Sequence, residues 1–200
     1  MQIAIEHLKN ADPVLASIIQ AVGPYRLSTR EPTFETLARS ITFQQLHGRA
    51  AAKIFERVRK AAGRRFTAKA FLQIPEETLR ACGLSRQKIA SLTDLAQRVA
   101  RRELNFRRLA TLEDEEIIRQ LSVVRGVGVW TAQMFLIFAL QRPNVLPTGD
   151  FGIRNAIRKA YRLPELPKPS EVARLAEKWH PYCSIASWYL WRSLDGPVGI

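Results

Sequence analysis

The stretch from Leu121 to Arg154 combines a glycine turn with a single carboxylate further along the chain. Gly126 and Gly128 flank Val127, so the backbone can turn tightly there and approach a ligand without a Cβ in the way. We expect a long apolar helix to begin at Thr131 and Ala132, and the N–H groups of its first turn have no partners inside the helix. Backbone donors of this kind can bind phosphate.

The carboxylate is that of Asp150, which follows the apolar helix and a proline-containing loop and precedes the segment FGIRNAIRKAY. A carboxylate held beside a reacting carbon can stabilise developing positive charge or orient a water molecule. A helix N-terminus favours the ionised form that either role needs. The alternative is that Asp150 only caps the helix that it precedes, because Asp is a common N-cap.

The motif VRGVGVWTA (Val124 to Ala132), followed by LPTGD (Leu146 to Asp150), resembles the helix-hairpin-helix DNA glycosylases. Within that superfamily it looks most like the 3-methyladenine DNA glycosylase II group, and the resemblance extends from about Phe34 to Trp191. It implies that Asp150 is catalytic, because positive charge builds on the sugar as the base leaves. It also implies a base flipped out of the duplex before the N-glycosidic bond is hydrolysed.

The residue at position 130 bears on the type of reaction. Superfamily members that also cut the strand carry a lysine there, which attacks the sugar and forms a Schiff base. This chain has Trp130 instead, and no lysine occurs between Gly126 and Lys159. The resemblance therefore implies a monofunctional enzyme without lyase activity, in which water is the nucleophile.

Aromatic side chains could form a pocket for a positively charged alkylated purine, since such a base binds the faces of electron-rich rings. A cationic purine is also a good leaving group, so no strong general acid is required. Trp191 matches a pocket tryptophan of the family, and Met134 stands where some relatives have a tyrosine. Each aromatic taken alone is more often a core residue than a pocket residue, and Trp130 could belong to the core of the hairpin. The expected pocket residues are Trp130, Phe43, Phe151, Trp191 and Met134.

The segment ITFQQLHG (Ile41 to Gly48) resembles the end of the family's QQ-containing helix. We expect Gln45, with Leu46 second, to fill the gap that a flipped nucleotide leaves in the duplex. His47 replaces a small hydroxyl residue and could contact the minor groove or a phosphate; alternatively it is an exposed junction residue. Around the hairpin, the expected DNA-binding residues are Arg125, Gly126, Val127, Gly128 and Thr131.

No cofactor is expected to be required. The resemblance also implies a monovalent cation, Na+ or K+, held at the hairpin by the backbone carbonyls of Ser122, Val124 and Val127. The two cysteines, Cys82 and Cys183, form no CxxC or Cys/His cluster, which argues against zinc or an iron–sulfur centre.

The composition favours a polyanionic partner. Lys and Arg total 31 against 18 Asp and Glu, a formal net charge of +13, which points to nucleic acid rather than membrane. The N-terminal segment carries charges throughout and is not a signal peptide. The most apolar run, Met134 to Leu140, is too short to span a bilayer. We therefore expect a cytoplasmic monomer whose partner is double-stranded DNA containing damaged bases.

The hydrophobic periodicity is helical almost everywhere, and no stretch alternates as a strand should. We expect an all-α fold of about ten helices, with N-caps at Asp12, Thr33, Thr67 and Ser85. The resemblance divides the single glycosylase domain (1–200) into two lobes with the active site in the cleft between them. Residues 32–145, ending in the hairpin at about 121–132, would form the middle lobe, and residues 1–31 with 146–200 the other.

These features together predict a DNA glycosylase of base excision repair that acts on alkylated purines of the 3-methyladenine and 7-methylguanine type. One alternative is a non-catalytic helix-hairpin-helix module that only binds DNA. Another is a glycosylase for oxidised or mismatched bases, although the missing lysine argues against its lyase-coupled form. Only the enzyme hypotheses use Asp150.

Overall fold

The computed structural model describes residues 1–195, and these residues contain helices and loops but no strand. The expectation of an all-α fold is confirmed. The chain divides into two compact units, which we call unit 1 (residues 1–29 and 136–200) and unit 2 (residues 30–135). The second boundary falls within a helix, at 135/136, whereas the resemblance placed it at 145/146.

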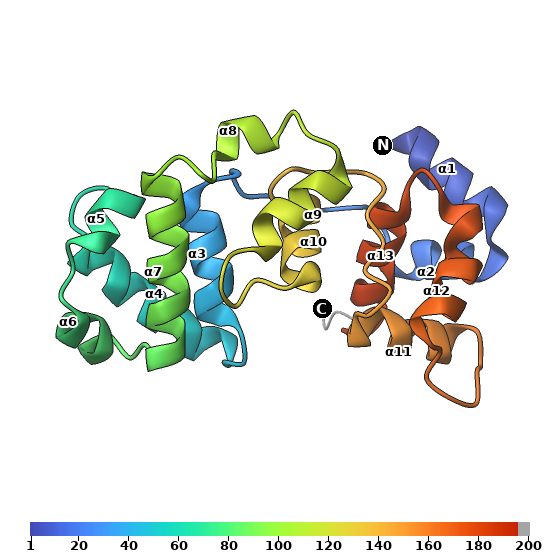
Figure 1. Cartoon of the computed structure of the whole chain (residues 1–200). Helices are drawn as coiled ribbons and strands as arrows, with labels where there is room; N and C mark the ends of the chain where they lie inside the picture. Colours follow the sequence, from blue (N-terminus) through green and yellow to red (C-terminus); the bar gives the residue numbers. More distant parts are fainter. Residues whose placement is uncertain (196–200) are drawn as a thin grey trace. The chain divides into compact units, whose positions relative to one another are not determined.

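Unit 2 is built around one long helix (Figure 1). This helix, α7, packs against α3, α5 and α6, and its side chains Leu92 and Leu95 are fully buried. The helices of unit 2 are α3 (Phe34–Phe43), α4 (Gly48–Ala61), α5 (Ala68–Leu72), α6 (Glu76–Ala81), α7 (Arg86–Ala100), α8 (Phe106–Leu109), α9 (Asp114–Ser122) and most of α10 (Val129–Phe138).

Unit 1 joins the two ends of the chain around an apolar core. Leu8, Leu15, Ile153 and Trp179 are buried in it, so segments far apart in sequence share one interior. Figure 1 shows α1 and α2 (blue) in the same unit as α11 to α13 (orange to red). The helices of unit 1 are α1 (Gln2–Ala11), α2 (Pro13–Val22), α11 (Phe151–Ala160), α12 (Pro169–Ala176), the 3-10 helix η1 (Glu177–Trp179) and α13 (Cys183–Arg192).

Helix starts follow the expected caps. The side chains of Asp12, Thr33, Thr67 and Ser85 each accept a hydrogen bond from a backbone N–H in the first turn of the following helix. Such caps satisfy donors that the helix itself leaves unpaired, so residues within three positions decide where these helices begin.

Two helices were not predicted. Helix α1 buries Ala4 and Leu8, but no side chain caps its start, so the sequence lacks the usual signal of a helix N-terminus. Helix α8 is capped by Asn105 but has only four residues, fewer than a periodic pattern needs. None of the helices among residues 1–195 has both the length and the apolar character needed to cross a bilayer.

The fully buried carboxylate of Asp12 connects the two ends of the chain in unit 1. It caps α2 and also accepts hydrogen bonds from the Tyr161 hydroxyl and from Trp179 Nε1, the latter at 2.8 Å. Lys178 Nζ lies 3.2 Å from the same carboxylate. A buried charge is tolerated only when it is paired and hydrogen-bonded, and Asp12 meets both conditions.

We predict that Asp12→Ala lowers the free energy of unfolding by about 3 kcal/mol, because it leaves buried donors without their acceptor. Asp12→Asn keeps an acceptor oxygen and should cost less. Urea unfolding at pH 7 measures both effects. A cost for Asp12→Ala no larger than that of an exposed substitution would contradict this role.

The pH dependence follows from the pKa of Asp12. Burial acts to raise this pKa, but the hydrogen bonds from Tyr161, Trp179 and Leu15 and the contact with Lys178 hold it below its ordinary value of 3.8. The ionised carboxylate therefore stabilises the fold fully above about pH 4, and this contribution is lost as the pH falls through the lowered pKa. The stability difference between the parent and Asp12→Asn should accordingly narrow only in acid.

Candidate functional site

The Asp150 carboxylate is oriented by two donors in unit 1. Asp150 is the N-cap of α11, and its Oδ1 accepts a hydrogen bond from the N–H of Ile153 at 2.8 Å. The indole Nε1 of Trp191, on α13, donates to the same oxygen at 2.9 Å. The residue is 9% exposed. The carboxylate is therefore an N-cap, as expected, and is also positioned by a side chain that a simple cap does not need.

The local backbone explains how Trp191 reaches Asp150. A turn precedes the helix, in which the N–H of Asp150 donates to the carbonyl of Pro147 at 3.0 Å. A Cβ at position 152 would lie 3.0 Å from Asp150 Oδ1 and 3.1 Å from Trp191 Cδ1. Gly152 therefore leaves the space in which the indole approaches the carboxylate, a role that was not predicted from the sequence.

Aromatic rings accompany the carboxylate within unit 1. Trp191 is half-buried and stacks on Phe138, with ring centroids 5.8 Å apart and planes at 26°. Phe151, the first residue of α11, is 69% exposed. Phe138 was not predicted, because a phenylalanine within an apolar helix carries no signal that distinguishes it from core.

The glycine turn lies in unit 2, between α9 and α10. Gly126 has a φ of +77°, a conformation that favours glycine, and Val127 is buried beneath the turn. Helix α10 begins at Val129, two residues before the expected start, and the Ala132 N–H donates to the Gly128 carbonyl at 3.1 Å. The turn thus leads directly into a helix N-terminus, as phosphate binding requires.

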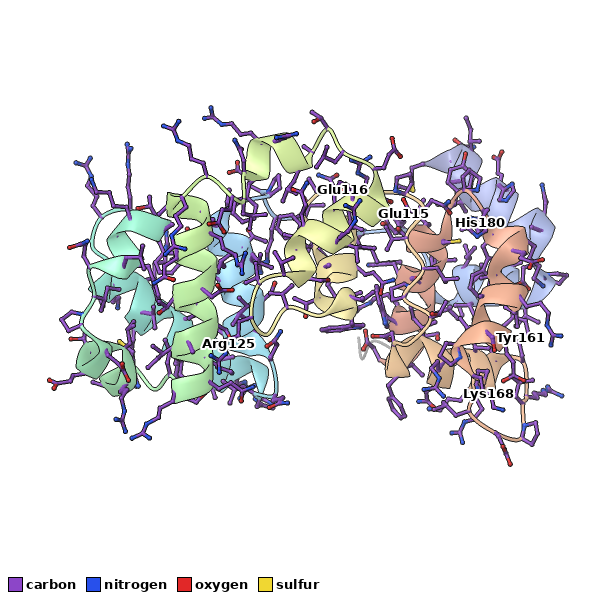
Figure 2. All side chains as sticks on the ribbon, viewed as in Figure 1. Glu115, Glu116, Arg125, Tyr161, Lys168 and His180 are labelled. Carbon is purple, nitrogen blue, oxygen red and sulfur yellow. The ribbon has the colours of Figure 1, made fainter. Side chains whose placement is uncertain are left out.

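Helix α7 supports the glycine turn through a hydrogen bond to its backbone. Asp94 Oδ2 accepts the backbone N–H of Arg125 at 2.8 Å, and Arg98 Nε lies 3.1 Å from both oxygens of the same carboxylate. Figure 2 shows Arg125 beside α7. Burial acts to raise the pKa of Asp94, but the N–H of Arg125 and the charge of Arg98 hold it below its ordinary value. The acceptor is therefore a carboxylate ion, which strengthens its bond to the hairpin backbone.

The expected plug residues follow α3 in unit 2. Gln45 is exposed and has a φ of +56°, and Leu46 is 39% exposed. His47 is exposed at the N-cap position of α4, where its side chain makes no capping bond. The three residues form a loop, here called the plug loop, whose side chains are accessible.

The first glutamine of the QQ pair has a different environment from the second. Gln44 Nε2 donates to the carbonyl of Gly126 at 2.9 Å and to Thr131 Oγ1 at 3.2 Å. Thr131, expected to bind DNA, is buried, and its hydroxyl oxygen accepts this hydrogen bond from Gln44. Gln44 belongs to the QQ motif but was not predicted as a site residue, because nothing in the sequence shows that its amide reaches the hairpin.

The remaining predicted pocket residues belong to unit 2. Trp130 is 49% exposed, so it is not the core residue of the hairpin that the alternative required. Phe43 is half-buried beneath Arg39, whose Cζ lies 3.7 Å from the ring centroid. Met134 is half-buried. The structure thus groups Asp150, Phe151 and Trp191 in one unit and the hairpin, plug loop and other aromatics in the other.

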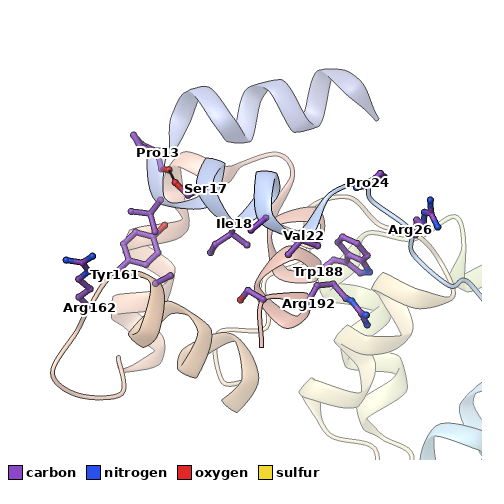
Figure 3. A pocket seen from close by; sticks show the side chains of 14 residues that line it. Pro13, Ser17, Ile18, Val22, Pro24, Arg26, Tyr161, Arg162, Trp188 and Arg192 are labelled. Carbon is purple, nitrogen blue, oxygen red and sulfur yellow. Dashed lines mark hydrogen bonds between the residues drawn. The ribbon is translucent and has the colours of Figure 1, made fainter. Parts of the chain in front are cut away.

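A separate cavity of about 1420 Å³ occurs in unit 1. Its lining includes Ile18, Val22 and Trp188 together with Arg26, Arg162 and Arg192. Figure 3 shows Tyr161 and Arg162 toward one end and Trp188 and Arg26 toward the other. None of the predicted site residues lines this cavity, so it is not part of the candidate site.

Comparison with known proteins identifies the class to which this fold and these motifs belong. A family model described as HhH-GPD superfamily base excision DNA repair protein matches residues 38–181. The chain is 36% identical to DNA-3-methyladenine glycosylase 1 of Schizosaccharomyces pombe over 194 residues, which cover 94% of the chain and 85% of that protein. The chain belongs to the HhH-GPD superfamily of base excision DNA repair proteins.

Solved structures agree with this assignment. The 3-methyladenine DNA glycosylase of S. pombe in complex with abasic DNA matches with a TM-score of 0.84 at 35% identity, over 96% of each chain. The DNA-3-methyladenine glycosidase of Bacillus halodurans matches with a TM-score of 0.87 at 30% identity, over 95% of this chain and 88% of that one. The resemblance stated from the GVG and LPTGD motifs is therefore confirmed.

We predict that Gly126→Ala disrupts the hairpin. An added Cβ would lie 2.7 Å from Ser91 Oγ, and the positive φ costs a residue with a side chain about 1–2 kcal/mol in addition. Thermal or urea unfolding should show the loss. Gly128→Ala is the matched control, because a Cβ there meets nothing within 4 Å.

The two causes can be separated in the double variant Gly126→Ala/Ser91→Ala, which removes the close contact but keeps the unfavourable φ. It should recover part of the lost stability. Equal stabilities for Gly126→Ala and Gly128→Ala would show that the hairpin does not need this glycine.

Proposed function

We propose that this protein is a monofunctional DNA glycosylase that hydrolyses the N-glycosidic bond of alkylated purines of the 3-methyladenine and 7-methylguanine type. The observation that carries the proposal is the Asp150 carboxylate, oriented by the Ile153 N–H and the Trp191 indole. Relatives named as 3-methyladenine DNA glycosylases support the substrate class. The partner would be double-stranded DNA inside the cell, bound by a monomer with a net charge of +13.

In the proposed reaction the damaged nucleotide leaves the base stack and its sugar approaches Asp150. As the bond to the base breaks, positive charge develops at the anomeric carbon, and the carboxylate stabilises it. The purine leaves with the bonding electron pair, and water then adds to that carbon and releases one proton to the solvent. Because an alkylated purine is already cationic, it needs little protonation to depart.

Exposed aromatic faces would supply base recognition. Trp130 and Phe151 are 49% and 69% exposed, and Trp191 is fixed by its bond to Asp150. A cationic base gains stabilisation from such ring faces, whereas a neutral base gains less. The half-buried Phe43 and Met134 would contribute to the shape of the pocket.

The strand would be bound through the hairpin and the plug loop. The backbone around Gly126 and Gly128 would bind a phosphate, with Arg125, Val127 and Thr131 shaping the turn. Gln45 or Leu46 would fill the gap in the duplex, and His47 would contact the minor groove or a phosphate.

A monovalent cation at the hairpin fits the residues present. The proposed ligands are the backbone carbonyls of Ser122, Val124 and Val127, and Na+ or K+ accepts oxygen ligands of this kind. The buried Ser122 hydroxyl has no hydrogen-bond partner among the residues described, which is consistent with a further polar group nearby. Bound there, the cation would supply positive charge toward a DNA phosphate. We propose no other cofactor.

We predict that Asp150→Asn abolishes base release while binding to lesion-containing duplex persists. Asparagine is also a good N-cap, so the start of α11 should survive while the negative charge is lost. Excision is measured by the release of methylated purines and binding by titration of labelled duplex. Unchanged excision would remove Asp150 from the mechanism, and absence of excision in the parent would favour the non-catalytic DNA-binding module.

We also predict that borohydride traps no covalent complex between the protein and its substrate DNA, and that strands remain uncut until the abasic product is treated with alkali. The reason is that Trp130 occupies the position of the lyase lysine. Release of 3-methyladenine, 7-methylguanine, hypoxanthine and uracil is compared in the same assay. A trapped complex would contradict the monofunctional assignment, and preferential release of uracil would contradict the substrate class.

A further inference from the structure

We propose that Gln44 and Lys88 are positioning residues that couple the hairpin to the plug loop. They would fix the position of the residue that fills the gap in the duplex relative to the hairpin that binds the phosphate. This inference rests on the proposed function. All the residues that carry it lie in unit 2, where the contacts between them are direct.

Gln44 connects the two DNA-binding elements through its side chain. Its Nε2 donates to the Gly126 carbonyl at 2.9 Å and to Thr131 Oγ1 at 3.2 Å, so one amide bonds both the turn and the first part of α10. The next residue along the chain is Gln45, the expected plug. A shift of the hairpin is therefore passed through a single side chain to the residue beside the plug.

Lys88 holds the backbone from which both glutamines project. Its Nζ donates to the carbonyl of Thr42 at 2.6 Å and to the carbonyl of Gln44 at 2.8 Å. A cation at the C-terminus of α3 is favourable because the last carbonyls of a helix lack partners within it. Lys88 is half-buried, and burial lowers its pKa. These bonds hold the backbone at the end of α3, directly before Gln45, whose φ is +56°.

The same helix supports the hairpin. Lys88, Ser91 and Asp94 are spaced three residues apart on α7, and residues at this spacing lie on one side of a helix. Ser91 closely approaches Gly126, and Asp94 accepts the N–H of Arg125 at 2.8 Å. One face of α7 thus bonds the backbone just before the plug loop through Lys88 and supports the hairpin through Ser91 and Asp94. The side chain of Gln44 links this backbone segment to the hairpin.

This arrangement has a consequence for base flipping. A flipped nucleotide returns to the stack unless the gap is filled while the flanking phosphate is held. Loosening the link should therefore weaken the protein's preference for DNA that contains a gap, while leaving general electrostatic binding unchanged. It should also slow excision from a paired site more than excision from a site where flipping costs little.

The test compares Gln44→Leu and Lys88→Met with the parent, with Lys88→Arg as the conservative variant. Lys69→Met, an exposed lysine of α5, controls for the loss of one positive charge. The first measurement is the affinity for duplex containing an abasic site relative to the affinity for undamaged duplex. The second is single-turnover excision of an alkylated purine from paired duplex and from an unpaired bulge. Thermal unfolding verifies that each variant is folded.

We expect Gln44→Leu and Lys88→Met each to lose about tenfold in preference for abasic duplex and in excision from paired duplex, the equivalent of about one hydrogen bond. Excision from the bulge should change far less. Lys88→Arg should recover much of the loss, and Lys69→Met should match the parent in the preference ratio. The double variant Gln44→Leu/Lys88→Met should lose less than the product of the single losses, because both residues act on one loop.

An unchanged preference for abasic duplex, or equal losses of excision from paired and bulged sites, would overturn the coupling. If the parent releases no alkylated purine, the proposed function fails, but the binding preference still decides the coupling independently. The two failures are therefore distinguishable.

Discussion

The orientation of one carboxylate is the constraint on which the proposed chemistry of this protein depends. Asp150 Oδ1 receives two N–H donors, one from the backbone of Ile153 and one from the indole of Trp191. The first comes from the start of α11 and the second from α13, so the carboxylate is held by two helices that pack together in unit 1. Gly152 leaves the space for this approach, because a Cβ there would crowd both Asp150 and Trp191.

In the proposed function, unit 2 meets a different requirement, which is to present its hairpin backbone to DNA in a rigid form. N–H groups that are kept available for a phosphate cannot also bond within the hairpin, so the other polar groups of its backbone need partners from neighbouring side chains. The carboxylate of Asp94 accepts a hydrogen bond from the Arg125 N–H, and the side-chain amide of Gln44 donates one to the Gly126 carbonyl. The residues proposed for catalysis therefore lie in unit 1, and the hairpin proposed to bind the strand lies in unit 2.

The sequence was most informative where chemistry depends on neighbours along the chain. The cap of α11 by Asp150 and the special backbone of Gly126 both follow from residue type and local order. The choice between Gln44 and Gln45 shows the opposite case. The QQ motif indicated that one of the two glutamines has a role at the site. Only the fold shows that Gln44 bonds the hairpin whereas Gln45 is exposed. Phe138 was not predicted, because its position in an apolar helix does not indicate that its ring stacks on Trp191.

The sequence by itself determined the helical class, the net positive charge, the glycine turn and the acidic cap, because each depends on residue type or on spacings of a few positions. The tertiary structure alone decided the partners of the polar groups. Trp191 reaches Asp150 across 41 residues, Gln44 reaches Gly126 across 82, and Trp179 reaches Asp12 across 167. Such pairs form only when packed helices bring distant side chains within about 3 Å, and no local pattern encodes that approach.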